Sequence, residues 1–243
     1  MSLISVMYHH LNSDRCSNDV GIFEEHLRYI SKNFTSVFPG EDVGQKSICL
    51  TFDDAYADFY FLTYPLLKKY NLKAVLAVPT KYILDDTDLS AETRMNYEHN
   101  DLFINYEKAT FCTFKELKEM LDSGLVQIAS HSHTHTNLLE NGVSLDDELK
   151  LSKEILEAKL NIKVDSFFFP YGKYNAEILE ETKKLYKYAF RIGNAVHRDF
   201  SGINGVIYRV NGDGLKKADE IFTMSAMMRY KLKALTKKIS RKI

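Results

Sequence analysis

The stretch ICLTFDDAYADF, residues 48–59, begins as a strand and ends in two adjacent carboxylates, Asp53 and Asp54. One of them could cap the helix that follows, because an acidic group near a helix start is favourable by about 0.3–1 kcal/mol. That role accounts for one carboxylate only. Adjacent residues leaving a strand end point in different directions, so one carboxylate can bind a cation while the other acts beside it as a base.

Similar apolar, β-branched runs alternate along the chain with segments of helical period, which is the pattern of a sheet built from βα units. Seven or so strands joined by helices predict an α/β fold, either a (β/α) barrel or an open parallel sheet. In both architectures, functional groups gather at the carboxyl ends of the strands. The expected strands are Leu3–Tyr8, Ser47–Phe52, Ala74–Val78, Val126–Ala129, Ser166–Phe169, Tyr188–Arg191 and Val206–Val210.

The helices between these strands carry recognisable start signals. The segment FEEHLRYISKNF, residues 23–34, places Phe23, Leu27 and Ile30 on one apolar stripe. Thr113 with Glu116 predicts a capping box at the start of a later helix. The segment SLDDELKLSKEILEAKL, residues 144–160, repeats this device with Ser144 and Glu148.

Two segments stand apart from this pattern. Residues 84–110 are polar and poorly periodic, so we expect a long insertion over one rim of the sheet, with His99 on its surface. Residues 229–243 form a basic C-terminal tail with seven basic residues, no acidic one, and Leu232, Leu235 and Ile239 at helical spacing. This tail is either a solvated helix end or an amphipathic segment that meets acidic lipid or a partner. Residues 1–228 then form a single domain.

The composition is that of a soluble globular protein. The chain has 243 residues, 45% of them apolar and 27% charged, and a formal charge of −1, so no overall charge points to nucleic acid. Its three cysteines are far apart and odd in number, which fits reduced thiols. No basic leader and no run of 18 apolar residues occurs. We therefore expect a cytoplasmic protein, membrane-peripheral if the tail meets lipid.

The stretch SHSHTH, residues 130–135, places three histidines on alternate positions directly after an apolar run. On an extended strand all three would share one face, whereas on a helical turn the two that are four apart stack and the middle one turns away. Asp54 and two of these imidazoles would leave open positions on a cation for water and substrate. Such a cation lowers the pKa of its bound water towards ~7 and polarises a carbonyl, which indicates metal-assisted hydrolysis.

The third motif is SFFFPYGKYN, residues 166–175, a hydrophobic strand stopped by Pro170 and a Tyr-Gly turn. Taken alone, it is a plain strand-to-loop turn, for which Pro and Gly are the usual residues. In combination with the other two motifs it gains a role, because a backbone N–H at such a turn can face the oxyanion of a tetrahedral intermediate.

TFDD, HSHTH and FPYGKYN, in this order and spacing, resemble the leading motifs of the polysaccharide deacetylases, the NodB-homology or carbohydrate esterase 4 family. The opening LISVMYHHL with FEEHLRYISKNFTSV is similar to the poly-N-acetylglucosamine deacetylase subgroup, and the likeness spans most of residues 3–210. The resemblance implies a distorted (β/α) barrel of about seven strands that removes acetyl groups from N-acetylated sugars. It also implies a divalent metal, zinc first, with cobalt or nickel as alternatives.

The resemblance further implies roles for particular residues. Asp53 becomes the general base, and Asp54, His131 and His135 become the metal ligands, so that the intervening His133 faces elsewhere. The backbone after Pro170, at Tyr171 and Gly172, helps hold the oxyanion.

This chain departs from the family pattern at three points. Phe168 stands where many members have an arginine that orients the base, and we expect Arg209 to supply that charge from a neighbouring strand end. Without any tryptophan, the wall built by the family's fourth motif has to come from other residues. No histidine follows His197, so His9 is the preferred general acid, with His10 and His197 as weaker choices. Alternatively, His9 is a packed rim residue without a catalytic part.

Three hypotheses follow for the function. The first is a metal-dependent N-deacetylase acting on an N-acetylated saccharide, in a polysaccharide or in a glycan precursor made inside the cell. The second keeps the site but changes the substrate to a cyclic imide or another small amide. The third is a carbohydrate-binding homologue without turnover, against which the intact Asp53 argues, because binding needs no free base. A membrane or a glycan-synthesis protein is the expected partner of the basic tail.

Overall fold

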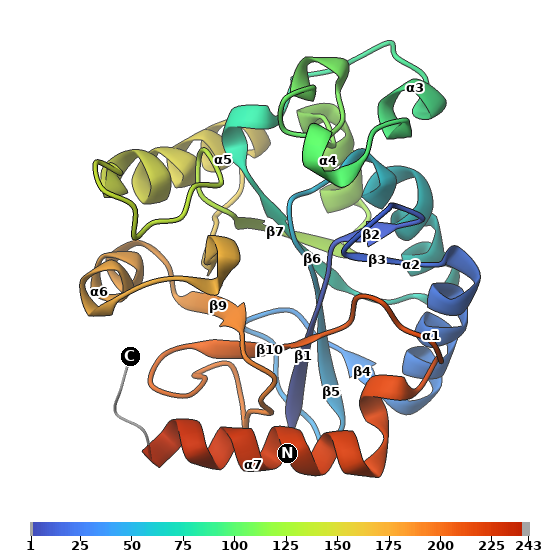
Figure 1. The fold of residues 1–243 in the computed structure, drawn as a ribbon, viewed down its shortest axis with the longest axis vertical. Helices are drawn as coiled ribbons and strands as arrows, with labels where there is room; N and C mark the ends of the chain where they lie inside the picture. The colour runs from blue at the N-terminus through green and yellow to red at the C-terminus, as the bar shows by residue number, and fades with distance from the viewer. Residues whose placement is uncertain (1, 240–243) are drawn as a thin grey trace.

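Seven parallel strands close into a barrel in the computed structural model, which describes residues 2–239 (Figure 1). The strand order is β1, β10, β9, β8, β7, β6, β5, and β1 pairs with both β10 and β5. This closure confirms the barrel and excludes the open sheet. The bounds are β1 Leu3–Tyr8, β5 Ser47–Phe52, β6 Ala74–Val78, β7 Val126–Ser130, β8 Ser166–Phe168, β9 Tyr188–Ile192 and β10 Ile207–Asn211.

Three short strands lie outside the barrel. β4 (Thr35–Ser36) extends the sheet beside β5, and β2 (His10–Leu11) pairs with β3 (Ser17–Asn18). The predicted strands agree with the structure to within one residue at each end, because each one is an apolar run with a sharp polar boundary.

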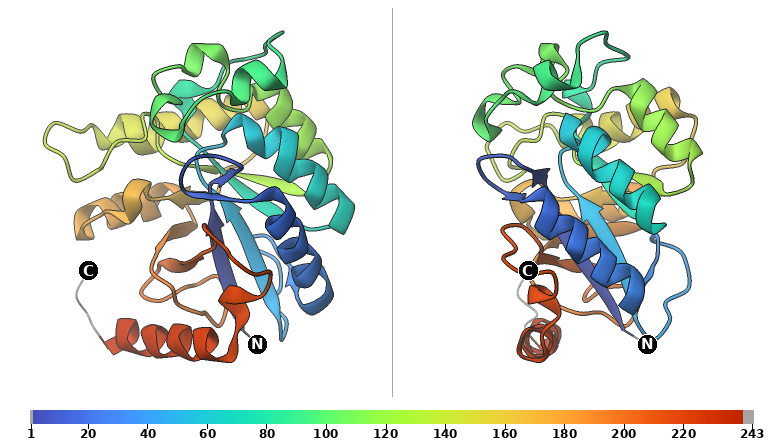
Figure 2. Two further views of the ribbon diagram at one scale, coloured as in Figure 1. Left: turned by 45° about the vertical axis from the view of Figure 1, so that its right-hand side comes forward. Right: turned by 90° about the vertical axis from the view of Figure 1, so that its right-hand side faces the viewer.

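Helices cover the outside of the barrel (Figure 2). The longer ones are α1 Val20–Asn33, α2 Tyr64–Tyr70, α4 Phe114–Asp122, α5 Ser152–Leu160, α6 Ala176–Leu185 and α7 Met224–Ile239. π-helical turns precede α2 (η1 Phe59–Thr63) and α5 (η5 Asp146–Leu151). Short 3₁₀ turns complete the chain at η2 Thr80–Tyr82, η3 His99–Asp101, η4 Tyr106–Lys108, η6 Pro170–Gly172 and η7 Glu220–Phe222. No helix among residues 2–239 is both long and apolar enough to cross a membrane.

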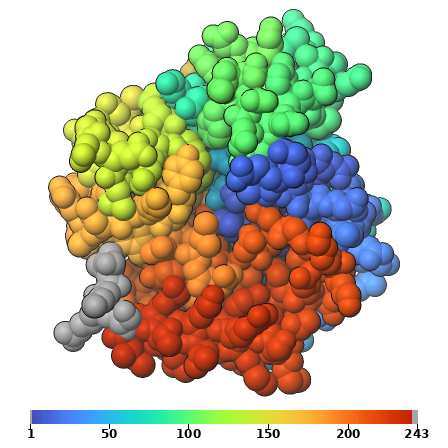
Figure 3. All heavy atoms as spheres, in the orientation of Figure 1, coloured from blue at the N-terminus to red at the C-terminus, as the bar shows by residue number. Residues whose placement is uncertain are grey.

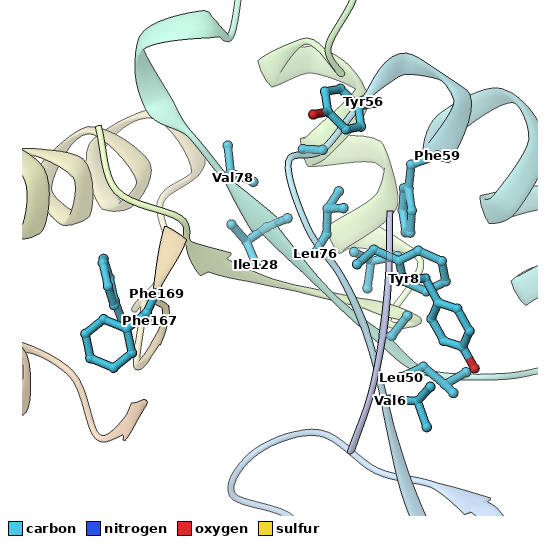
Figure 4. Close-up of a cluster of buried hydrophobic side chains, with 14 of the residues drawn as sticks. Val6, Tyr8, Leu50, Tyr56, Phe59, Leu76, Val78, Ile128, Phe167 and Phe169 are labelled. Carbon is cyan, nitrogen blue, oxygen red and sulfur yellow. The ribbon is translucent and has the colours of Figure 1, made fainter. Parts of the chain in front are cut away.

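Alternation along the strands divides the apolar side chains into two cores. One core joins the outer faces of the strands to the helices, and Figure 4 shows part of it, including Val6, Leu50, Leu76 and Ile128. The other core fills the barrel and consists mainly of strand residues: Leu3, Cys49, Val75, Ala77, Ala129, Phe168, Phe190 and Ile207 are among its members. Both faces of each strand are therefore buried, which explains the nearly continuous apolar runs.

The same alternation determines which polar side chains reach the barrel interior. Asp53 follows Cys49 by four residues, His131 follows Ala129 by two, and Arg209 follows Ile207 by two. Because side chains repeat every second residue, all three point inward where the strands end. The barrel thus brings chemically active groups from three separate strands to one place.

The insertion at residues 84–110 folds into α3 (Ala91–Met95) and the turns η3 and η4, above one rim of the barrel (Figure 1). Arg94 is buried and fixes this segment. Its Nε donates to the Ala109 carbonyl at 2.7 Å, and its Nη2 donates to the Phe111 carbonyl at 2.9 Å and to Glu116 at 2.8 Å. Glu116 also accepts the N–H of Thr113 at 2.8 Å, which confirms the predicted capping box.

The predicted division at residue 228 does not coincide with an element boundary. α7 begins at Met224 and continues through that position to Ile239. Residues 240–243 of the predicted tail lie outside the described residues.

We expect Arg94→Ala to lower the free energy of unfolding by about 3–5 kcal/mol, because it leaves a buried carboxylate and two carbonyls without their partner. Urea denaturation followed by circular dichroism measures this loss. Arg28→Ala, which removes an exposed ion pair with Glu25, is the control and leaves the unfolding midpoint unchanged. Equal stability of the two variants would show that Arg94 does not hold the insertion.

Candidate active site

A cleft of about 930 Å³ opens where the carboxyl ends of the strands meet, and it appears as the hollow at the centre of Figure 3. Asp54, His131 and His135 meet in it. Asp54 Oδ1 lies 3.4 Å from His131 Nε2 and 3.1 Å from His135 Nε2. The three ligand atoms are all within 4.8 Å of one another. The structure therefore brings together the three predicted metal ligands, one from the turn after β5 and two from the loop after β7.

Left-handed backbone conformations aim two of these ligands. On a regular strand, Asp54 would point away from Asp53, but its φ of 70° and that of Ala55 at 54° turn the chain sharply. Ser132 and His135 have φ values of 68° and 55°, and the Ser132 hydroxyl accepts the N–H of His135 at 3.0 Å. Such conformations cost about 1–3 kcal/mol each in non-glycine residues and cluster at functional sites.

Hydrogen bonding and burial prepare the two imidazoles as ligands. His131 donates its Nδ1–H to the Phe168 carbonyl at 2.8 Å, which leaves the lone pair of Nε2 facing Asp54. His135 packs against the rings of Phe103 and Tyr171, each with its centroid 5.0 Å away. Burial lowers the pKa of His135 to about 4, so its ring is neutral and able to bind a cation.

The residues present fit a divalent cation. Asp54 Oδ1 is a buried oxygen with no hydrogen-bond partner among the described residues. Zinc bonds of about 2.0–2.1 Å in a tetrahedral set place neighbouring ligand atoms about 3.3 Å apart, which matches the separations from Asp54 Oδ1 to the two imidazoles. One carboxylate and two imidazoles also leave positions for water and substrate, as catalytic sites do.

His133 faces away from this triad, as predicted, and its Nδ1 lies 2.8 Å from the Thr80 hydroxyl. The loop around it is held by Glu148. That carboxylate accepts the N–H groups of His133 and Thr134 at 3.0 and 2.9 Å, and the Thr134 hydroxyl at 2.6 Å. The predicted capping role of Glu148 is therefore wrong, although Ser144 does accept the N–H of Asp147 at 3.2 Å.

Asp53 is held mainly by Arg209, and His131 Nε2 lies farther away, 4.0 Å from Asp53 Oδ2. The guanidinium donates through Nη1 to Asp53 Oδ1 and through Nη2 to Oδ2, the latter at 2.8 Å. Burial raises the pKa of Asp53, but the charge of Arg209 outweighs it and holds this pKa well below its usual range. Arg209 also lies 4.5 Å above the ring of Phe168. Phe168, at the position where the resemblance implies an arginine, thus packs against Arg209, which pairs with Asp53 from β10.

His9 contacts Asp53 on one side and Asp213 on the other. Its Nε2 lies 3.8 Å from Asp53 Oδ2, and its Nδ1 lies 2.7 Å from Asp213 Oδ2. Burial lowers the pKa of His9, but the hydrogen bond with Asp213 and the charges of Asp53 and Asp213 raise it to about 10. The ring is therefore protonated at neutral pH, as a general acid must be.

Asp213 was missed by the sequence analysis. It lies in the segment NGDG just past the end of β10, where the rule on strand ends could have singled it out. Gly212 allows this segment to approach β1, since a Cβ there would come within 2.3 Å of the Tyr8 ring.

The other histidines are placed differently from the expectations. His10 Nδ1 lies 3.2 Å from Asp58, its Nε2 lies 3.1 Å from His99 Nδ1, and its ring stacks on Tyr56. His99 therefore lines the cleft and is not merely on the insertion surface. His197 is buried against the backbone of Tyr208. Neither weaker candidate for the acid lines the cleft.

The turn at Pro170–Gly172 borders the cleft beside His135. Gly172 donates to the Phe169 carbonyl at 2.9 Å and Lys173 donates to the Pro170 carbonyl at 3.2 Å. The N–H of Tyr171 has no hydrogen-bond partner within the described part of the chain, and its φ of 57° is left-handed. A donor is thus available at the predicted position. Tyr171 and Ile192 line the cleft. They form part of its wall in a chain that has no tryptophan.

This arrangement, a (β/α) barrel with a candidate metal triad at its strand ends and a separate ionised aspartate, is that of metal-assisted hydrolases. The family model for polysaccharide deacetylase matches residues 40–189. The chain belongs to the polysaccharide deacetylase family, and the predicted resemblance is confirmed.

Curated relatives are distant. The Bacillus subtilis protein YxkH, which carries a polysaccharide deacetylase name, is 26% identical over 196 residues, 74% of this chain and 60% of that protein. A poly-beta-1,6-N-acetyl-D-glucosamine N-deacetylase of Escherichia coli K12 is 25% identical over 174 residues, 60% of this chain and 25% of that protein. The chain thus spans less than two thirds of the length of either relative.

Solved structures share the fold. BC0361, a polysaccharide deacetylase from Bacillus cereus, aligns with a TM-score of 0.75 at 20% identity and covers 93% of this chain and 69% of that one. The Streptococcus pyogenes deacetylase PplD in complex with acetate aligns with a TM-score of 0.71 at 22% identity and covers 95% of this chain and 98% of that one. These likenesses agree with the closed barrel.

We expect Glu148→Gln to weaken zinc binding about tenfold, because the histidine loop loses the charged acceptor that fixes it while all three ligands remain. Competition with a zinc-sensitive dye measures the affinity. Glu140→Gln, on an exposed position nearby, is the matched control and leaves the affinity unchanged. Wild-type affinity in Glu148→Gln would show that the loop needs no such support.

Proposed function

We propose that this protein is a metal-dependent N-deacetylase that hydrolyses the acetamide of an N-acetylated sugar in a polysaccharide or glycan precursor. The observation that carries the proposal is that the candidate metal ligands and the candidate acid and base are separate groups in the cleft. Asp54, His131 and His135 form a ligand set, while Asp53 and His9 are each held by a partner of their own. Membership of the family and the likeness to poly-beta-1,6-N-acetyl-D-glucosamine deacetylases support the saccharide substrate.

Asp54, His131 and His135 would hold a divalent cation, zinc in our proposal with cobalt or nickel as substitutes, and that cation would supply Lewis acidity to a water and to the acetamide carbonyl. Asp53 accepts the proton of that water as its oxygen bonds to the carbonyl carbon. Arg209 keeps Asp53 ionised and fixes its orientation for this step. The N–H of Tyr171 donates to the oxyanion that develops.

His9 completes the reaction at the nitrogen. When the C–N bond breaks, the departing amine needs a proton, and His9 donates it from Nε2 while Asp213 holds Nδ1. The products are acetic acid, which ionises to acetate, and the free amino sugar. Asp53 then gives its proton to solvent and His9 takes one back, so both groups return to their starting states. The base Asp53 and the acid His9 have different partners, Arg209 and Asp213. This suits the reaction, because the base must start deprotonated and the acid must start protonated.

The surface beside the site suits a chain of sugars. A second hollow of about 540 Å³, lined in part by Asn137, Glu140 and Lys173, meets the cleft at His135 and Tyr171. Tyr171 is 59% exposed and stands where the two hollows join. A polymer can therefore lie across Tyr171, with further residues on either side of the one that reacts.

Acetate release from an acetylated glucosamine oligomer, measured with zinc-loaded protein, tests the function. We expect release that stops on adding a chelator, returns with zinc or cobalt, and falls by about 10²–10⁴ in Asp53→Asn, which retains the metal but lacks the base. Turnover of a cyclic imide with no acetate from any saccharide would favour the small-amide hydrolase instead. Saccharide binding without turnover of either substrate would favour the binding homologue.

We expect His9→Ala to lower the turnover number by about 10²–10⁴ while the zinc content of the purified protein stays the same, because His9 protonates the leaving amine and binds no metal. Asp213→Asn should cause a smaller loss, since the ring keeps a hydrogen-bond partner. Steady-state kinetics with metal analysis distinguishes these outcomes. Full activity of His9→Ala would remove it from the mechanism.

A further inference from the structure

The outer face of α7 carries an apolar stripe that is exposed to solvent. Met224, Met228, Leu232, Leu235 and Ile239 are between 57% and 81% exposed. They are five of the eleven large apolar side chains exposed among residues 2–239. At 3.6 residues per turn, their spacing places all five within an arc of about 80°. Single exposed leucines are ordinary, but a continuous stripe of this kind marks an interaction surface.

The opposite face of α7 holds the helix on the protein. Ala226, Tyr230 and Ala234 are buried, and the Lys237 ammonium lies 4.1 Å from the centre of the Tyr208 ring. Figure 1 shows α7 along the lower edge of the molecule, and the right-hand view of Figure 2 shows it end-on with no other element beneath it. The stripe thus points outward on a helix that is already anchored.

Basic side chains flank the stripe, most closely on one side. Lys231 and Lys238 lie directly along one border, whereas on the other side Arg229 and then Lys233 follow beyond Ser225 and Thr236, and all four basic side chains are exposed. No acidic residue occurs between Met224 and Ile239. An apolar centre with a cationic border complements a surface that is apolar inside and anionic at its edge, which is the chemistry of an anionic bilayer. A second copy of the same helix would instead oppose like charges.

We propose that α7 lies in the plane of an anionic membrane surface, with its apolar stripe between the lipid headgroups and its basic side chains on the phosphates. The stripe begins at Met224, so the surface is longer than the basic tail predicted from residue 229. The cleft opens toward the viewer in Figure 3, whereas α7 borders the lower edge in the same orientation. A bilayer against α7 therefore leaves the cleft accessible.

Flotation of the full chain with vesicles tests the proposal, using phosphatidylcholine alone and phosphatidylcholine with about one third phosphatidylglycerol. We expect binding to the anionic vesicles only, weakened as salt rises from about 0.1 to about 0.5 M. The combined substitutions Met228→Ser, Leu232→Ser and Leu235→Ser, and separately Lys231→Gln with Lys233→Gln, should each reduce the bound fraction about tenfold. The matched control replaces exposed apolar residues elsewhere, Leu89→Ser with Ile104→Ser, and binds as the wild type does.

Wild-type protein that stays unbound, or a serine variant that binds as well as the wild type, would overturn the proposal. A wild-type dimer in sedimentation velocity that the same serine substitutions dissociate would assign the stripe to a second copy instead. The inference does not rest on the deacetylase activity. Acetate release from a soluble oligomer should be unchanged in the α7 variants, which separates the two proposals.

Discussion

Side chains alternate between the inside and the outside of a closed parallel barrel, and the rest of this structure depends on that alternation. Every strand is buried on both faces, so an inward residue near a carboxyl end either packs in the core or joins the site. Cys49 and Ala129 do the former, whereas Asp53 and His131 lie farther along the same inward-facing rows and do the latter. A shift of one residue in any strand would exchange the two faces and disperse the site.

Beyond the strand ends, turns with strained backbone conformations position the site residues. Asp54, His135 and Tyr171 are not on regular strands, and all three have positive φ. Their conformations are held by neighbours: Ser132 accepts the N–H of His135, and Glu148 binds the loop on its other side. Strain of this kind survives because the rest of the fold over-determines it, and it lets adjacent aspartates take two different roles.

The strands and the region of the candidate site could be predicted from the sequence because their signals are local. Apolar runs mark the strands, and the spacing of SHSHTH with the pair Asp53 and Asp54 marks the site. The choice of His131 and His135 came from the family resemblance, since spacing alone left two geometries open. Asp213 lies just past a strand end, which is a local signal, but its contact with His9 could not be predicted, and neither could the contacts of Glu148, since only the closed barrel brings these residues near one another. His9 and Asp213 are 204 positions apart in the chain. Glu148 also carried a competing local interpretation as a helix cap, and tertiary contacts overrode it.

The balance of charge in the cleft connects these observations. Three carboxylates, those of Asp53, Asp54 and Asp213, converge there, and two cationic groups, Arg209 and protonated His9, oppose them. One negative charge is left over, buried and costly unless compensated. A divalent cation would reverse the excess to one positive charge, which in the proposed reaction would favour a developing oxyanion over a neutral acetamide. The same groups that would attract the cation would thus leave a field suited to the proposed transition state, while Arg209 pairs with both carboxylate oxygens of Asp53.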